Sequence, residues 1–147
     1  MSKVSAAAML AIVFALPLPA YGISQLERMI LEEIACDRNP RPTSILRELA
    51  RIEKIDVSEN VGYDSMSCWK IDGGIDVVGM RFVSICGFEE DAGIRERNTD
   101  LYYRGPGTSP GQMLSLGSDV SSDELAEWYF RTFGPRLINS AISDGER

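Results

Sequence analysis

Few residue types in this chain can do chemistry, because it contains no histidine. The absence of imidazole excludes Ser-His-Asp and Cys-His activation of a nucleophile, and proton transfer by a histidine that titrates near neutral pH. Most catalytic zinc sites also use at least one imidazole, so we expect no metal. We expect no other cofactor either. Carboxylates are the remaining candidates for catalysis.

Three consecutive acidic residues follow a predicted strand: Glu89, Glu90 and Asp91. A pair of carboxyl groups is sufficient for glycoside hydrolysis, which needs only an acid and a base or nucleophile. Adjacent acidic residues at such a position are far more often a solvated edge of the sheet. We therefore expect a solvated edge here, and we keep a small carboxylate-based hydrolase acting on envelope glycans as an alternative function.

The cysteines Cys36, Cys68 and Cys86 allow one disulfide and one remaining thiol. A disulfide is the default use of cysteine in an exported domain, which meets an oxidising compartment. A Cys68–Cys86 bridge is favoured, although a two-residue turn at Gly73–Gly74 would place Cys68 opposite Gly79. Pairings through Cys36 and three buried free thiols are the alternatives. A metal site is not expected, since no Cys-x-x-Cys motif is present.

The segment 104–112 (RGPGTSPGQ) is the most distinctive stretch of the sequence. The glycines and prolines of 105–111 exclude regular structure there, and the segment lacks the spacing and the lysine of a phosphate-binding loop. Proline and glycine preset the backbone and so lower the cost of ordering it on a partner. The alternative is an ordinary hairpin connection. The candidate binding residues are Tyr102, Tyr103, Arg104, Thr108, Ser109 and Gln112.

Residues 1–22 have the features of a secretory signal peptide. Lys3 supplies a positive charge, and an apolar run over 6–16 is followed by two prolines and small residues. Cleavage after Gly22 fits the small-x-small rule better than cleavage after Ala20. The apolar run is too short to cross about 30 Å of hydrocarbon, so no membrane span is expected after signal removal. We expect the mature chain in the periplasm or outside the cell.

The length of 147 residues is that of one domain, and 15 Lys and Arg stand against 22 Asp and Glu, which gives a net charge of -7. Binding to nucleic acid requires a basic face that neutralises phosphate, so we expect no nucleic-acid partner. A polybasic membrane-surface protein is not expected for the same reason.

Helices are predicted where capping residues precede apolar residues at helical spacing. The capping box Ser24–Glu27 (SQLE) begins a helix over 25–35, and Thr43 or Ser44 caps a second helix. A second capping box (SSDE) begins a C-terminal helix over 122–133. The apolar stripe of the second helix is Ile45, Leu46, Leu49 and Ile52, and that of the C-terminal helix is Leu125, Trp128, Tyr129 and Phe133.

Strands are predicted at 65–71, 75–78 and 80–88, with Gly73–Gly74 as a hairpin turn. A second hairpin is predicted from strands at 101–104 and 112–116. The chain therefore reads as α+β: two N-terminal helices, an antiparallel sheet of about four to five strands, and a C-terminal amphipathic helix packed on the sheet. Residues 23–147 are expected to form this single domain.

These features favour a small exported binding protein without enzymatic activity. It would recognise a protein partner, in the envelope or outside the cell, through the tip of the 102–112 hairpin. By class alone, its size, signal and disulfide potential resemble small bacterial periplasmic inhibitors and immunity proteins, and no diagnostic motif of those families is present. A further alternative is a structural envelope protein that oligomerises through the 122–133 helix, where Phe130 points away from the apolar stripe.

Overall fold

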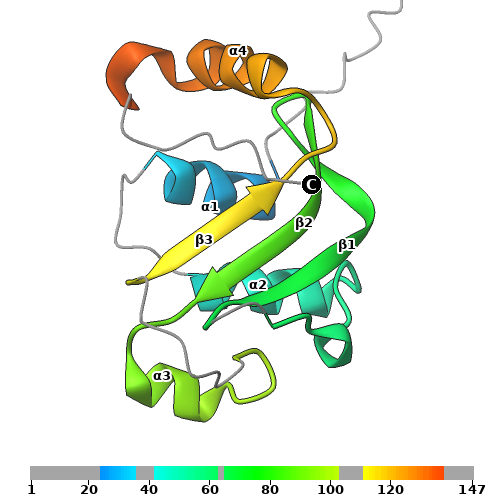
Figure 1. Ribbon diagram of the computed structural model, residues 1–147, viewed down its shortest axis with the longest axis vertical. Coiled ribbons are helices and arrows are strands. Elements are labelled where there is room, and N and C mark those ends of the chain that lie inside the picture. Colours follow the sequence, from blue (N-terminus) through cyan, green and yellow to red (C-terminus); the bar gives the residue numbers. More distant parts are fainter. Residues whose placement is uncertain (1–23, 36–41, 63–64, 103–110, 138–147) are drawn as a thin grey trace, which may run out of the picture.

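The computed structural model describes residues 24–35, 42–62, 65–102 and 111–137. It is an α+β fold with a three-stranded antiparallel sheet in the order β1-β2-β3 (Figure 1). Within the described residues, no helix is long and apolar enough to cross a membrane. The predicted signal peptide lies outside the described residues. The elements are α1 (Gln25–Ile34), α2 (Pro42–Arg51), η1 (Val57–Glu59), β1 (Ser67–Val77), β2 (Met80–Phe88), α3 (Ala92–Arg97), β3 (Met113–Gly117), α4 (Ser122–Phe133) and η2 (Gly134–Leu137).

The capping signals that predicted α1 and α4 are confirmed. The Ser24 hydroxyl accepts the Glu27 backbone N–H at 3.1 Å, and the Glu27 carboxylate accepts the Ser24 N–H at 3.3 Å. The Ser121 side chain accepts the N–H of Glu124 in the same way. Helix α2 begins at Pro42, before the predicted caps, because proline at the first helical position gives up only a donor that would be unpaired there.

The core lies between one face of the sheet and helices α1 and α2, with α4 at one end of the molecule (Figure 1). Trp69 and Ile85 from the sheet pack in one buried cluster with Ile30 of α1 and Leu46 of α2. Ile52, predicted in the α2 stripe, is instead 38% exposed because it follows the end of the helix.

Helix α4 is joined to the end of the β1–β2 hairpin through Trp128. The Trp128 ring lies 5.4 Å from the ring of Phe82, centroid to centroid. Its indole N–H lies 3.1 Å from each of the carbonyl oxygens of Val77 and Val78. Trp128 thus attaches the C-terminal helix to the turn of the hairpin, and the neighbouring Tyr129 is buried in the same core. The predicted packing of this helix on the sheet is confirmed only in part, because the helix lies at one end of the molecule (Figure 1).

The predicted turn at Gly73–Gly74 is wrong, because both glycines lie within β1. The turn is Val78–Gly79, and both of its residues have positive φ, 48° and 76°. A turn at this point extends both strands, so that Ile75 and Val77 pair with Phe82 and Met80 in the core. The glycines belong to a bulge: the four residues 71–74 lie between two register pairs that enclose only Val83 on β2.

The predicted Cys68–Cys86 disulfide is confirmed. The register at the turn, continued without the bulge, would place Cys68 opposite Glu89. The three extra residues of the bulge bring Cys68 opposite Cys86 instead. The Cys68 backbone is bonded away from β2, its N–H to Asn60 Oδ1 at 3.2 Å and its C=O to the N–H of Val61 at 2.8 Å. The two cysteines thus face each other at a non-hydrogen-bonded position, where paired side chains approach most closely.

The predicted strand at 101–104 does not form at its described residues. The N–H groups of Leu101 and Tyr102 both reach the carbonyl of Asn98, at 3.0 and 3.2 Å, and so close a turn after α3. Both side chains are buried from that turn, which satisfies their apolar character without a strand. The sheet consequently has three strands in the described part of the chain, where four to five were predicted.

Candidate functional site

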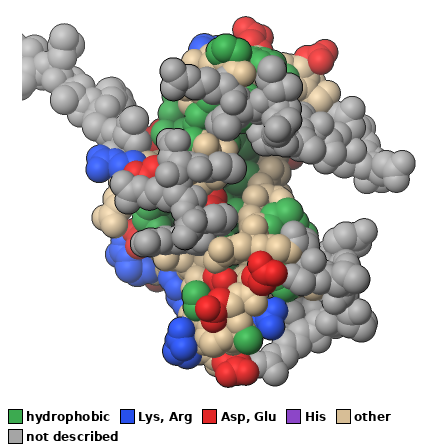
Figure 2. Space-filling model, turned by 90° about the vertical axis from the view of Figure 1, so that its left-hand side faces the viewer, with side chains coloured by type: hydrophobic (Ala, Val, Ile, Leu, Met, Phe, Trp, Pro, Cys, Tyr) green, Lys and Arg blue, Asp and Glu red, His purple; other side chains and the backbone are tan. Residues whose placement is uncertain are grey.

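The candidate site is a buried polar cluster around Glu89, where β2 ends. Glu89 continues the alternation that directs Ile85 and Gly87 into the core, and it is only 1% exposed. Figure 2 shows acidic and basic side chains together on the surface at the end of the molecule where α3 lies. The Glu89 carboxylate is separate from that charged surface, because it is directed inward.

Three donors from separate segments bind the Glu89 carboxylate. Its Oε2 accepts the Thr43 hydroxyl of α2 at 3.1 Å. Its Oε1 accepts the Gln112 side-chain amide at 2.8 Å and the Asp91 backbone N–H at 3.1 Å. A buried carboxylate is costly unless hydrogen bonds replace its water. The three bonds supply that replacement, and they also join α2 and the start of β3 to the end of β2.

Tyr102 extends the cluster through a short hydrogen bond between its hydroxyl and that of Thr43. The tyrosine is 6% exposed, and burial raises the pKa of its hydroxyl to about 12. The hydrogen bond to Thr43 acts against that rise, whereas the negative charge of Glu89 adds to it. Tyr102 therefore stays neutral at physiological pH and serves as a fixed polar anchor.

Arg47 of α2 fixes the chain just before Tyr102. Its guanidinium binds both carboxylate oxygens of Asp100, at 2.6 and 2.7 Å, and the Oδ1 of Asn98 at 2.8 and 3.0 Å. The hydrogen bonds from Arg47 lower the pKa of the Asp100 carboxyl, and the same contact raises the pKa of Arg47. These hydrogen bonds from the Arg47 guanidinium hold residues 98–100 against α2.

Of the predicted binding residues, the structure describes Tyr102 and Gln112, and brings both into the Glu89 cluster. Their side chains face inward and anchor the two ends of the 102–112 segment. Tyr103, Arg104, Thr108 and Ser109 lie outside the described residues, as does Cys36.

The solvated edge expected at the three acidic residues is correct for Glu90 and wrong for Glu89. Glu90 is exposed, and Asp91 caps α3 by accepting the Ile94 N–H at 2.9 Å. Sequence reasoning also missed Thr43 as a partner of Glu89. The alternation of β2 could have placed Glu89 inside, but only with knowledge of the bulge that sets its inward positions.

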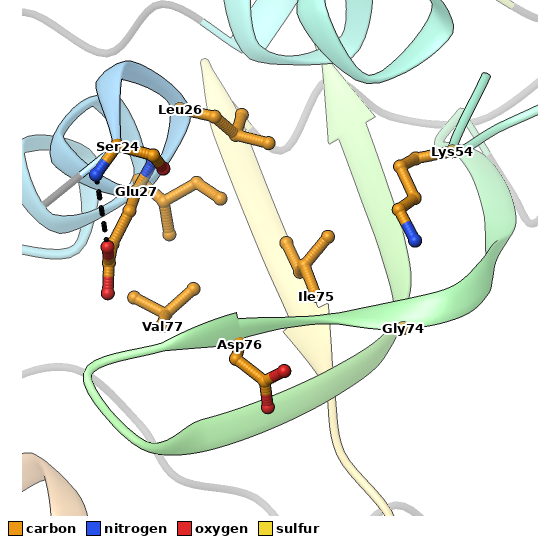
Figure 3. A pocket seen from close by; sticks show the side chains of 9 residues that line it. Ser24, Leu26, Glu27, Lys54, Gly74, Ile75, Asp76 and Val77 are labelled. Carbon is orange, nitrogen blue, oxygen red and sulfur yellow. Dashed lines mark hydrogen bonds between the residues drawn. The ribbon is translucent and has the colours of Figure 1, made fainter. Parts of the chain in front are cut away.

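Two shallow pockets lie elsewhere on the described part of the molecule. One, of about 270 Å³, lies beside the start of α1 (Figure 3). The other, of about 620 Å³, contains Lys54 and Lys70 among four carboxylates, those of Glu53, Asp56, Glu59 and Asp72. No group of three or more Cys, Asp or Glu side chains among the described residues is arranged to hold a metal ion.

No protein-family model, curated protein or solved structure matches this chain. The chemistry of its own residues is therefore the guide to its function.

Proposed function

We propose that this protein is a small exported binding protein without enzymatic activity. It recognises a protein partner, in the envelope or outside the cell, through the segment 102–112. The observation that carries the proposal is the Glu89 cluster, which holds Gln112 directly and Tyr102 through Thr43. Because both ends of the segment are anchored to the core, less freedom remains to be lost when a partner binds.

The anchoring assigns different roles to the predicted binding residues. Tyr102 and Gln112 are positioning residues, because their polar groups are already bonded within the protein. The residues that contact the partner are then Tyr103, Arg104, Thr108 and Ser109. Tyrosine and arginine are the residue types that most often carry binding energy at protein interfaces.

Export is part of the same proposal. The Cys68–Cys86 disulfide is compatible with an oxidising compartment. N-terminal sequencing of the product from cells tests this part. We expect the mature chain to begin at Ile23, or at Tyr21 if cleavage follows Ala20. An intact Met1 on protein from the cytoplasm would contradict export.

The hydrolase alternative has less support from the cluster. A catalytic carboxylate has to reach its substrate, whereas Glu89 is 1% exposed and Asp91 is engaged as the cap of α3. Self-association through α4 is a second candidate function, favoured by Phe130, which is 51% exposed on that helix. A Phe130→Ser variant that changed the oligomeric state in sedimentation would favour it over the binding module.

The binding proposal is tested by capture of a partner from envelope extract with purified residues 23–147. Affinity is then measured for Arg104→Ala and for a variant in which an Asn-Gly turn replaces residues 105–110, so that Gly111 and Gln112 remain. Arg131→Ala is the matched control, since it removes an exposed arginine from α4.

We expect at least about a tenfold loss of affinity for both segment variants, which is the effect of losing an interface anchor. The melting temperature should stay near that of the unmodified chain, because loop-closure entropy changes slowly with loop length. The control should bind as the unmodified chain does. Unchanged affinity in both segment variants would show that 102–112 is only a connection.

A further inference from the structure

The pocket beside the start of α1 has an apolar floor and a charged rim (Figure 3). The floor is formed by Ile30 of α1 and by Ile75 and Val77 of β1, all of them buried, together with Leu26. Ser24, which precedes α1, also lines the pocket. The peptide bond that joins Ser24 to the preceding residue is therefore located at the pocket.

Three charged residues line the pocket: Glu27, Asp76 and Lys54. Lys54 Nζ donates to the Asp72 carbonyl at 3.0 Å, and Asp76 points away from the side of β1 that carries Ile75 and Val77 (Figure 3). Glu27 is thus the charged group directed at the junction.

Glu27 joins α1 to the turn of the hairpin. Its Oε2 accepts the Ser24 backbone N–H at 3.3 Å, and its Oε1 accepts the Val78 backbone N–H at 2.7 Å. A positive charge close to this carboxylate would be attracted to it, and would so stabilise the arrangement in which Glu27 joins both elements.

Cleavage after Gly22 would create such a charge. Water hydrolyses the Gly22–Ile23 peptide bond, Gly22 leaves with the new carboxylate, and the Ile23 nitrogen becomes an α-ammonium group. Successive backbone nitrogens are at most about 3.7 Å apart. The ammonium must then lie within about 7 Å of Glu27 Oε2, given the 3.3 Å between that oxygen and Ser24 N. Cleavage after Ala20 would move the charge two residues further away.

We propose that this pocket binds the mature N-terminus. The Ile23 side chain then lies on its apolar floor, and the Ile23 α-ammonium group lies beside Glu27. The inference rests on the proposed export, which supplies the cleavage. Removal of the signal then does more than release the chain: it adds the cation that completes the junction between α1 and the β1–β2 hairpin.

The test uses mature chains made in vitro with defined N-termini, beginning at Ile23 or at Tyr21, so that it does not depend on how cells process the precursor. The pKa of the α-amino group is measured from the pH dependence of its acylation. In the chain that begins at Ile23 we expect this pKa at least about half a unit above the ordinary 7.7–8.0, a threefold tighter binding of the proton. The chain that begins at Tyr21 should show a smaller rise.

Glu27→Gln is the decisive variant, because glutamine can still complete the capping box while the charge is lost. We expect it to abolish the rise in the α-amino pKa. Asp76→Asn is the matched control, since it removes a carboxylate that points away from the pocket floor, and it should retain the rise. An α-amino pKa that is ordinary, or that does not respond to Glu27→Gln, would overturn the charge contact.

The side-chain half of the proposal is tested separately with Ile23→Gly, which should lower the melting temperature, and Ile23→Val, which should largely retain it. A melting temperature unaffected by Ile23→Gly would overturn occupation of the floor. Because a raised pKa favours the charged form, the stabilisation should be complete below about pH 7.7 and lost as the pH rises through the folded-state value. Failure of export itself would appear only in the sequencing of the cellular product.

Discussion

At the scale of the residue, Glu89 and Glu90 are adjacent carboxylates with opposite surroundings. Glu90 is exposed, whereas Glu89 is 1% exposed and accepts three hydrogen bonds. Glu89 directly follows the last residue of β2 and continues the inward alternation of Ile85 and Gly87, whereas Glu90 lies on the outside. Thr43 and Gln112 provide the donors that make this inward position tolerable.

We predict that Glu89→Ala strongly destabilises the protein, because it leaves the Thr43 hydroxyl, the Gln112 amide and the Asp91 N–H without their acceptor. The Thr43 and Gln112 donors are half-buried, whereas Asp91 is exposed to water. A buried donor left unpaired costs about 1–3 kcal/mol, so the two half-buried donors together should lower the free energy of unfolding by about 2 kcal/mol. Urea denaturation measures it. The control Glu90→Ala should stay within about 0.5 kcal/mol of the unmodified chain. Equal effects of the two variants would contradict the cluster.

Tyr102 gives a prediction for alkaline pH. Its folded-state pKa is raised to about 12, above the unfolded value near 10. A raised folded-state pKa means that the stabilisation is complete below about pH 10 and is lost as the pH rises toward 12. The difference in melting temperature between the unmodified chain and Tyr102→Phe should shrink over that range. A constant difference up to pH 12 would show that Tyr102 ionises as a solvated tyrosine does.

At the scale of the element, the β1–β2 hairpin contains two pairs of residues that could have formed its turn. Val78–Gly79 forms it, and Gly73–Gly74 lies in the bulge that shifts the register by three residues. Glycine is needed at Gly74 for two reasons. Its φ is +69°, and a Cβ there would lie 3.0 Å from the Phe82 carbonyl oxygen.

Gly74→Ala and Gly79→Ala form a matched pair that separates these two reasons. Both positions have positive φ, but a Cβ at Gly79 would meet no atom within 4 Å. Each variant should lose about 1 kcal/mol through backbone strain, and Gly74→Ala should lose at least about 1 kcal/mol more through the clash in the bulge. Thermal unfolding of both variants measures this. Equal losses would mean that the bulge can widen without cost.

At the scale of the whole molecule, the disulfide and the buried cluster tie together segments that are far apart in the sequence. Cys68–Cys86 closes the hairpin across the bulge, while Glu89 joins α2 to the start of β3. The disulfide and the Glu89 cluster lie at the same end of β2, next to the flanks of the 102–112 segment. A covalent bond and a buried polar cluster therefore both lie close to the attachment of the proposed recognition segment.

We predict one disulfide and one free thiol in the oxidised protein. Alkylation without reduction, followed by mass spectrometry, should label Cys36 alone, and reduction should expose Cys68 and Cys86. Loss of the bond in Cys68→Ala should cost about 3 kcal/mol, and the double variant with Cys86→Ala should cost no more. Label on Cys68 or Cys86 before reduction would contradict this pairing in solution.

The sequence by itself determined the features that depend on neighbouring residues. The capping boxes at Ser24 and Ser121 and the helical spacing after them place α1 and α4, and alternation identifies β1 and β2 as strands. The cysteine count and the expected compartment predicted the disulfide. Glycine and proline content singled out 102–112 as the proposed recognition segment, and two of its residues, Tyr102 and Gln112, lie at the candidate site.

Only the tertiary structure decided the turn, the register and the burial of Glu89. Two residue pairs in the hairpin can adopt positive φ, and the choice between them depends on how Ile75 and Val77 pack against the rest of the core. The three-residue shift in the bulge then determines which residue faces Cys68 and which face of the sheet Glu89 joins. These outcomes depend on the burial of side chains from elements distant in sequence, so local spacing does not contain them.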